Sequence, residues 1–454
     1  MSRLFSIKNF GCRATQADGA GIAADLVARG LLRTEDHTSA DVVVINTCTV
    51  TAEADRDARQ TIHRIHRENP GAEVLVTGCY AQRSPQELSV IQGVKWVVGN
   101  SHKHQIGDVI APRLVQINSA GSQRHAYHGE IVSGTVLVGD VGAMRTVPSM
   151  AVGDALGRSR PNVKVQDGCS NRCTFCVIPS VRGQSRSASA DAVIREIRSL
   201  EMRYPEIVLT GINLGRWGRD LEGRPRFVEL LREILAETSV RRIRLSSIEP
   251  MDWSEALIDL MASSERIAKH VHIPLQSGSD SVLRRMRRRY RVRHYESRVA
   301  LARHWMPFAA IGADVMVGFP GESDAEFEDT RAFVERMPFT YLHVFSYSSR
   351  AGTEAAGMSV QVPKSVKRER NRILRQLIDR KNIEFRRSLV GRTVTAVTLA
   401  AGRDGLRALS ENFVEIDLSA ADAQPGLLTE VRIESADAGR TVGACLGQPA
   451  KAIC

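Results

Sequence analysis

Long apolar runs are missing from this 454-residue sequence, and a transmembrane helix would need about 18 to 20 consecutive apolar residues. The opening stretch, MSRLFSIKNFGC, has one early Arg, but a strand-like pattern interrupted by polar residues follows it in place of the continuous apolar segment of a secretory signal. With 43% hydrophobic and 25% charged residues, the composition is that of a globular protein. We therefore expect a cytoplasmic protein without a membrane partner, built from roughly two to four domains.

An acidic excess is missing as well, because 62 Lys and Arg outnumber 51 Asp and Glu and give a formal net charge of +11. A basic balance favours an anionic partner, most often nucleic acid. Basic residues gather in two stretches, RRMRRRYRVR at 284–293 and a helix-like segment at 364–387. We expect Arg287, Arg288 and Arg291 to contact nucleic-acid phosphates; the alternative is that this run is a solvated helix face.

Cysteine is scarce, with eight residues in the whole chain, which excludes a dense disulfide framework. Three of the eight lie in DGCSNRCTFCVIP, where Cys169, Cys173 and Cys176 form a C-x3-C-x2-C pattern. A closed structural zinc site needs a fourth ligand, and the next cysteine is as far away as Cys445. Three thiolates suit a 4Fe–4S cluster with one open iron, and zinc remains the alternative.

Three other cysteines each follow a strand-like run in the first hundred residues: LFSIKNFGC, DVVVINTC and EVLVTGC. Helix-like stretches separate these runs, so the pattern predicts βαβ units and a parallel sheet. Cys12, Cys48 and Cys79 would then meet at the carboxyl edge of the sheet, where open α/β sheets bind ligands. The alternative is that all three are buried core residues.

The rest of the chain predicts two further domains. Residues 116–155 read as a Gly- and Ser-rich connector, and from Asn162 six strand-like runs alternate with helix-like stretches. This alternation predicts a parallel barrel or partial barrel with its site at the strand ends. After Arg387, short alternating strands predict a small β-barrel. We expect domains at 1–115, 156–382 and 383–454.

The C-x3-C-x2-C loop after a first barrel strand resembles that of radical S-adenosylmethionine (SAM) enzymes. The motifs GC at 11–12, NTCTVT at 46–51 and TGCYAQ at 77–82 resemble those of the methylthiotransferases within that superfamily. The resemblance covers nearly the whole chain. It implies an α/β fold class: a flavodoxin-like parallel α/β domain, a partial (β/α) radical SAM barrel, and a small TRAM-like β-barrel that holds RNA.

The same resemblance implies two 4Fe–4S clusters and S-adenosylmethionine as cofactors. Cys12, Cys48 and Cys79 would hold an auxiliary cluster that carries sulfur, and the C-x3-C-x2-C cysteines would hold the radical SAM cluster. The implied partners are tRNA, an electron donor such as flavodoxin or ferredoxin, and a sulfur source. No catalytic residue is implied beyond the cluster ligands. One departure is Thr15, where the family often has Asn, near the auxiliary cluster.

Residues at the predicted strand ends are implied to line the SAM pocket, with the aromatic residue before the last cysteine near the adenine. The alternative for each of them is ordinary turn chemistry. The candidates are Phe175, Gly211, Asn213, Ser247, Glu249, Gln276 and Gly318.

Within the family, the sequence is most similar to the branch that modifies N6-threonylcarbamoyladenosine next to the tRNA anticodon. The stretches that carry this similarity are NTCTVTAEADRDARQ, NPGAEVLVTGCYAQ and GVKWVVGN. That branch transfers a methylthio group to carbon 2 of the base, with S-adenosylmethionine as both methyl donor and radical source. Other branches act on N6-isopentenyladenosine in tRNA or on an aspartate of a ribosomal protein. A zinc-containing, non-catalytic RNA-binding protein is the alternative from a different class.

Overall fold

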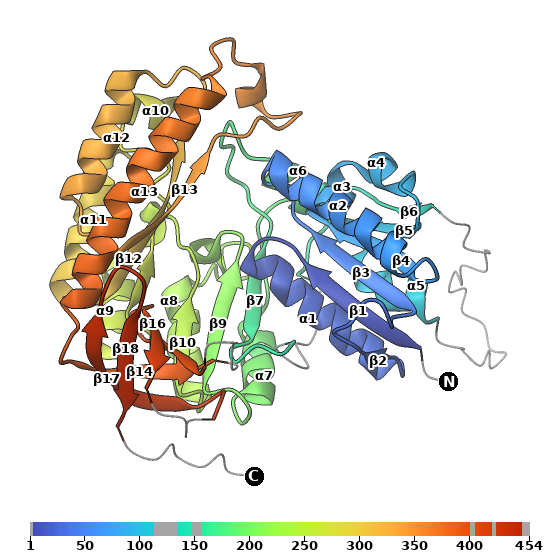
Figure 1. Cartoon of the computed structure of the whole chain (residues 1–454), viewed down its shortest axis with the longest axis horizontal. Coiled ribbons are helices and arrows are strands. Elements are labelled where there is room, and N and C mark those ends of the chain that lie inside the picture. Colours follow the sequence, from blue (N-terminus) through green and yellow to red (C-terminus); the bar gives the residue numbers. More distant parts are fainter. Residues whose placement is uncertain (1–2, 113–133, 148–155, 400–404, 420–423, 447–454) are drawn as a thin grey trace. The chain divides into compact units, whose positions relative to one another are not determined.

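The computed structural model describes residues 3–112, 134–147, 156–399, 405–419 and 424–446. The chain divides into two compact units (Figure 1): residues 1–153 with 177–184, and residues 154–176 with 185–454. Of the predicted connector at 116–155, only residues 134–147 lie within the described part. Among the described residues, no helix is long and apolar enough to cross a membrane.

The first unit is built on a six-stranded parallel sheet in the order β2-β1-β3-β4-β5-β6. Its two middle strands are almost entirely buried, as expected for strands covered on both faces. The strands are β1 (Leu4–Asn9), β2 (Leu32–Arg33), β3 (Val42–Thr47), β4 (Glu73–Gly78), β5 (Val94–Gly99) and β6 (Thr135–Leu137). The predicted parallel sheet is confirmed.

The helices of this unit begin where the sequence supplies their start signals. In α2 the side chain of Thr51 accepts a hydrogen bond from the amide of Ala54, and Ala58, Ile62 and Ile65 form the buried face. In α1 small residues allow the helix to lie close to β1. The helices are α1 (Arg13–Ala28), α2 (Ala52–Glu68), α3 (Cys79–Arg83), α4 (Pro85–Ser89), α5 (Ile106–Ile110) and α6 (Ile178–Arg182).

The second unit contains six strands that run parallel in two groups, β10-β9-β7 and β11-β12-β13 (Figure 1). A short strand, β8 (Arg186–Ser187), pairs antiparallel with β7. The six strands are β7 (Asn162–Asp167), β9 (Glu206–Gly211), β10 (Arg242–Leu245), β11 (His270–His272), β12 (Ala310–Val317) and β13 (Tyr341–Ser346). These are the six predicted runs, so the partial-barrel prediction is confirmed.

Helices follow the strands of the second unit in sequence. Several carry side-chain caps, such as Ser189 in front of α7 and Ser323 in front of α12. The helices are α7 (Ala190–Leu200), α8 (Phe227–Glu237), α9 (Glu255–Ser263), α10 (Asp280–Arg285), α11 (Val292–Trp305), α12 (Asp324–Arg336) and α13 (Lys364–Arg387).

The last part of the chain closes into a five-stranded barrel in the order β14-β15-β16-β18-β17. Alternate residues such as Val394, Ala396, Val431 and Ile433 fill its interior. The strands are β14 (Thr393–Thr398), β15 (Arg407–Ser410), β16 (Glu415–Leu418), β17 (Leu428–Ala436) and β18 (Thr441–Cys445). The predicted small β-barrel is confirmed, while the exact domain boundaries stay predictions.

A buried ion network connects this β-barrel to the half-barrel formed by the six parallel strands that precede it in the sequence. Glu206 is fully buried and pairs with Arg242 and Arg244. The same guanidinium groups donate hydrogen bonds to backbone carbonyls of the β-barrel, at 3.0 Å to Thr395 and 2.9 Å to Ser410. Burial alone would raise the pKa of Glu206, but the positive charges of Arg244 and Arg242 hold that pKa well below its usual range.

Two candidate cysteine sites

In the first unit, three cysteines follow the carboxyl ends of three parallel strands. Cys12 caps α1, Cys48 follows β3 directly, and Cys79 begins α3. Gly11 has a φ of +98°, and a side chain there would place its Cβ only 2.5 Å from the Cβ of Cys48. Glycine is therefore required at this position, since the loop that carries Cys12 packs directly on Cys48.

Cys48 lies close to both other thiols. Burial, together with the neighbouring Cys79 and Cys12, raises the pKa of Cys48 to about 12. Cys79 is 2% exposed and Cys48 is 8% exposed. Neighbouring buried thiols resist ionisation unless a positive charge accompanies them, and a bound metal cluster supplies that charge.

The sulfur of Cys79 is surrounded by hydrogen-bond donors. The Nε atom of Arg182 donates to Sγ of Cys79 at 3.2 Å, and the side-chain amide of Asn100 donates at 3.6 Å. A carboxylate oxygen of Asp18 accepts from Arg182 at 3.0 Å and from Lys103 at 2.7 Å. The donor set therefore fits an auxiliary iron–sulfur cluster held by these cysteines.

Thr15, the departure noted in the sequence, keeps a polar group at this site. Its Oγ1 lies 3.5 Å from Sγ of Cys12 and accepts from Arg182 at 3.4 Å. Sequence reasoning missed Arg182, which lies in α6 soon after the C-x3-C-x2-C loop but groups with the first unit. No local pattern in the sequence indicates that placement.

The second set of cysteines lies in the loop after β7, in the second unit. Sγ of Cys169 accepts from the amide of Asn171 at 3.4 Å and from the side chain of Asn213 at 3.7 Å. Sγ of Cys173 accepts from Arg288 at 3.4 Å. The amide of Cys176 donates to the carbonyl of Cys173, which folds the loop back on itself. Burial raises the pKa of Cys169, so its thiolate form needs a compensating positive charge, which a bound metal cluster would supply.

The spacing of the sulfur atoms bears on the zinc alternative. Two sulfurs bound to one zinc at about 2.3 Å lie no more than about 4.6 Å apart. Within the described part of the chain, the only group of three His, Cys, Asp or Glu ligand atoms that all lie within 4.8 Å of one another contains no cysteine. A cubane cluster spreads its three ligands over three irons. Both triplets therefore fit clusters better than single zinc ions.

The predicted SAM-pocket residues at the first strand ends surround the second cysteine loop. The amide of Asn213 donates to the side chain of Gln166 at 2.7 Å, and Gln166 in turn donates to the carbonyl of Gly168 at 2.8 Å. A side chain at Gly211 would meet Gln166 at 2.9 Å. These contacts link the end of β9 to the start of the cysteine loop at Cys169.

Glu249 forms an ion pair with Arg288, the residue that donates to Cys173. Ser247 Oγ lies 2.5 Å from Nδ1 of His272. Gln276 has a φ of +66° and a buried Oε1 without a hydrogen-bond partner in the described structure, as expected for a group that awaits a ligand.

Phe175 packs edge-on against Phe319, with ring centroids 6.4 Å apart. Gly318, with a φ of +71°, precedes Phe319 and donates its amide to Glu322 at 2.5 Å. The structure thus brings all seven predicted pocket residues into the second unit, and their role in binding S-adenosylmethionine stays a prediction.

The arginine run at 284–293 differs from the expectation at one position. Helix α10 ends at Arg285, and Arg287 has a φ of +56°, so the chain turns there. Arg288 consequently points inward, is 8% exposed and pairs with Glu249. This differs from the prediction that Arg288 contacts a phosphate. Arg287 is exposed and pairs with Glu354, and Arg291 is half-buried.

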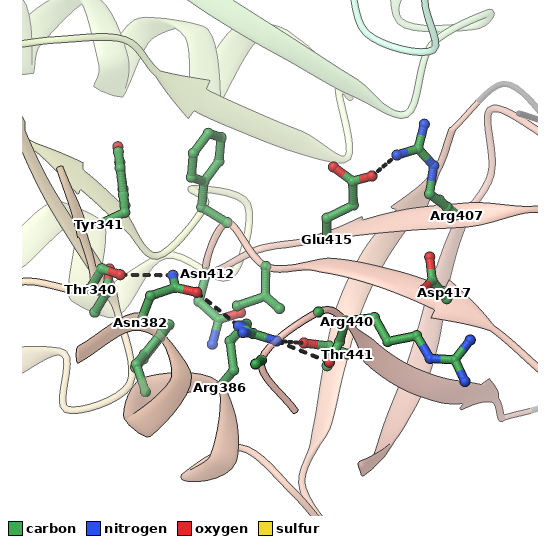
Figure 2. A pocket seen from close by; sticks show the side chains of 15 residues that line it. Thr340, Tyr341, Asn382, Arg386, Arg407, Asn412, Glu415, Asp417, Arg440 and Thr441 are labelled. Carbon is green, nitrogen blue, oxygen red and sulfur yellow. Dashed lines mark hydrogen bonds and ion pairs between the residues drawn. The ribbon is translucent and has the colours of Figure 1, made fainter. Parts of the chain in front are cut away.

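A cavity of about 540 Å³ lies between the start of β13, helix α13 and the β-barrel (Figure 2). Arg386, Arg407 and Arg440 line it together with aromatic and amide side chains. Figure 2 shows Arg386 held by Asn382 and by the carbonyl of Arg440. The lining carries both signs of charge, because Glu415 pairs with Arg407.

Two family models match the sequence. The radical SAM superfamily matches residues 163–334, which include the second cysteine loop, four of the six parallel strands in full and all but the first residue of β7. Uncharacterized protein family UPF0004 matches residues 4–99, which include Cys12, Cys48 and Cys79.

Curated relatives extend over most of the chain. The threonylcarbamoyladenosine tRNA methylthiotransferase MtaB of Aquifex aeolicus is 36% identical over 90% of this chain and 95% of its own length. The protein of the same name in Bacillus subtilis is 39% identical over 83% of this chain and 80% of its own length. Among solved structures, a radical S-adenosylmethionine methyltransferase, TsrM, from Kitasatospora setae has a TM-score of 0.53, with 17% identity over 78% of this chain and 77% of that one. The last likeness concerns the fold alone.

Proposed function

Because the chain belongs to the tRNA methylthiotransferases of the radical SAM superfamily, we propose that it transfers a methylthio group to carbon 2 of N6-threonylcarbamoyladenosine in tRNA. S-adenosylmethionine serves as both methyl donor and radical source. The observation that carries the proposal is the presence of two separate cysteine triplets, each at the carboxyl ends of parallel strands and each with N–H donors aimed at sulfur.

When bound, the two clusters supply an electron for the cleavage of S-adenosylmethionine and a site that carries the transferred sulfur. The residues of the chain hold and polarise these sites. In the second unit, Glu249 orients Arg288, and Arg288 places a positive charge beside Cys173. Asn213 donates to Cys169 and thereby fixes the loop against the end of β9.

In the first unit, too, a carboxylate holds an arginine that donates a hydrogen bond to a cysteine sulfur. Asp18 holds Arg182 and Lys103 in a buried ion cluster, and Arg182 directs its Nε–H at Cys79. A positive charge at this distance offsets the negative charge of the thiolates, which burial would otherwise make costly.

The chemistry requires partners besides tRNA. An electron must enter for each cleavage of S-adenosylmethionine, and each transfer consumes one sulfur atom. Flavodoxin or ferredoxin as the electron donor, a dedicated sulfur source and a cytoplasmic location all belong to the proposal. The predicted SAM-pocket residues, from Phe175 to Gly318, belong to it as well.

Mass spectrometry of tRNA nucleosides tests the function directly. Deletion of the gene should remove 2-methylthio-N6-threonylcarbamoyladenosine and leave its unmethylthiolated precursor, and restoration of the gene should reverse the change. If the 2-methylthio derivative of isopentenyladenosine disappeared instead, the substrate would be that of the neighbouring branch. A colourless zinc protein, without the broad absorption of iron–sulfur clusters, would favour the non-catalytic alternative.

A further inference from the structure

A polar cluster that contains no cysteine lies on the strands of the second unit. It consists of His272 at the end of β11, Asp314 in β12 and His343 in β13. In β12 the residues that alternate with Asp314, such as Ala313 and Val315, are completely buried and apolar. Asp314 therefore lies on the opposite face of the sheet, which a (β/α) barrel turns towards its interior.

The three side chains are spaced as ligands of one metal ion. One ligand atom from each residue lies within 4.8 Å of the other two. Oδ1 of Asp314 is 3.1 Å from Nδ1 of His343 and 3.4 Å from Nε2 of His272. Zinc binds imidazole nitrogen and carboxylate oxygen at about 2.0 to 2.2 Å, so its ligand atoms lie up to about 4.3 Å apart. Small side-chain adjustments would close this set around an ion.

The state of His272 points to a missing ligand. Its side chain is 8% exposed, and its Nε2 makes no hydrogen bond within the described structure. The other ring nitrogen, Nδ1, is held by Ser247 Oγ at 2.5 Å. Histidines that bind metals have this arrangement, in which an outer hydrogen bond fixes the ring and turns the free nitrogen towards the metal. The nearest acceptor to Nε2 is Oδ1 of Asp314 at 3.4 Å, outside good hydrogen-bond geometry, and a buried imidazole nitrogen held so loosely is costly unless a ligand binds there.

The cluster is also open enough to receive an ion. The side chain of His343 is 61% exposed and that of Asp314 is 23% exposed. Tyr341 stacks on His272 with ring centroids 5.8 Å apart and supports the ring from one side. An ion could therefore enter past His343 and reach the fixed nitrogen of His272.

We propose that His272, Asp314 and His343 bind one zinc ion on the interior face of the half-barrel. Two imidazole nitrogens and one carboxylate oxygen form a ligand set typical of zinc sites that keep a fourth position open for water or an oxygen ligand. This site is additional to the two clusters and takes none of their six cysteines.

Equilibrium dialysis of the full-length, cluster-loaded protein against radioactive Zn²⁺ tests the proposal. Loading the clusters first keeps the six cluster cysteines from binding zinc. We expect about one zinc per chain, with at least about a tenfold weaker affinity in His343→Gln. Ser247→Ala should weaken zinc binding by roughly 10- to 100-fold, because it releases the ring of His272. His294→Gln, an exposed histidine of α11, is the matched control and should bind as the wild type does.

Three results would overturn the proposal: no zinc at stoichiometric level in the wild type, equal binding in His343→Gln, or equal loss in His294→Gln. Iron content and circular dichroism of each variant establish that the fold is intact. Because His343 is mostly exposed, its substitution should leave the fold unchanged, so a folding defect in a variant of buried His272 would not remove the test.

Discussion

At the scale of single residues, the two cysteine sites should fail in different ways. Cys173→Ala should abolish reductive cleavage of S-adenosylmethionine, because it removes a ligand of the cluster that provides the electron. Cys48→Ala should spare that cleavage and abolish methylthio transfer. Assays of 5′-deoxyadenosine and of modified tRNA separate the two activities. If Cys48→Ala lost 5′-deoxyadenosine formation while Cys173→Ala retained it, the roles of the sites would be exchanged.

Arg182 provides a second prediction at this scale. Its Nε–H donates to Cys79, so Arg182→Gln removes a positive charge next to the auxiliary site. A hydrogen bond to a charged group contributes about 1.5 kcal/mol, equivalent to roughly 60 mV for one electron. The midpoint potential of the auxiliary cluster, followed by electron paramagnetic resonance, should therefore become more negative by about that amount.

Arg182→Lys keeps the charge and should shift the potential less than Arg182→Gln does. Arg64→Gln changes an exposed arginine of α2 in the same unit and should leave the potential where it is. A potential unchanged in Arg182→Gln, with full iron content, would mean that the guanidinium does not act on the cluster.

The sequence could predict the cysteines but not the arginines beside them. Cys12, Cys48 and Cys79 each end a recognisable strand, and parallel strands bring such ends together whatever the loops do. Arg182 is 103 residues away from Cys79 in the sequence, and Arg288 is 115 residues away from Cys173. Contacts of that separation depend on how helices and turns pack, and no periodic pattern encodes them.

At the scale of elements, the turn after α10 redefines the tRNA-binding prediction. Arg284, Arg287 and Arg289 are exposed, whereas Arg288 points inward. Replacing the three exposed arginines with glutamine should weaken tRNA binding. Each lost phosphate contact changes the slope of log affinity against log salt by roughly 0.7 to 0.9, so the slope should flatten by about two units. Titration of labelled tRNA at several salt concentrations measures it.

The matched control replaces Arg195, Arg232 and Arg241, which are exposed in the same unit but lie outside the run. The net charge changes equally, so a general electrostatic effect would appear in both variants. An equal slope in both variants would mean that residues 284–293 form a solvated surface without a specific role in tRNA binding. Helix α13 would then be the remaining basic candidate for the tRNA contact.

The turn also shows why the sequence could predict only in part which arginines of this run are exposed. A continuous basic run from Arg284 to Arg293 suggests one surface, since charged residues are usually exposed. The left-handed backbone at Arg287 breaks the helix and reverses which residues face inward. Backbone conformations of this kind are rare outside glycine, and nothing in a string of arginines indicates one.

At the scale of the whole molecule, the Glu206 network should contribute strongly to stability. Glu206→Ala would leave Arg242 and Arg244 buried without their shared carboxylate. Removing one partner of a buried ion pair costs about 3 to 5 kcal/mol, so we expect a clear loss of thermal stability by calorimetry. Glu237→Ala, which breaks an exposed pair with Arg198, should cost no more than about 1 kcal/mol.

The pH dependence of this contribution has a defined sign. The pKa of Glu206 is lower in the folded protein than in the unfolded chain, so its ionisation stabilises the fold above the ordinary glutamate pKa. That stability is lost as the pH falls from about 4.5 through the depressed folded value. Wild type and Glu206→Gln should therefore differ most at neutral pH and converge in strong acid. A difference that grew on acidification would contradict this linkage.

Iron content is a property of the entire chain. Two cysteine triplets in two units predict about eight irons per chain after anaerobic reconstitution. Cys48→Ala and Cys173→Ala should each lose about half of the iron, because the two sites lie in separate units. A wild-type protein that saturated at about four irons would mean that one triplet holds no cluster.

The segment at 177–184 belongs to the first unit although the residues on both sides of it belong to the second. The backbone consequently passes between the units at 153/154, at 176/177 and again at 184/185. One proteolytic cut at the first of these passages would leave a nicked protein whose fragments copurify, since α6 remains embedded in the first unit while joined to the second at both of its ends. A gene shortened to the first 153 codons would encode a unit without α6 and without Arg182. The two halves of this protein are therefore not exchangeable modules, and neither could be transplanted into another enzyme by simple fusion.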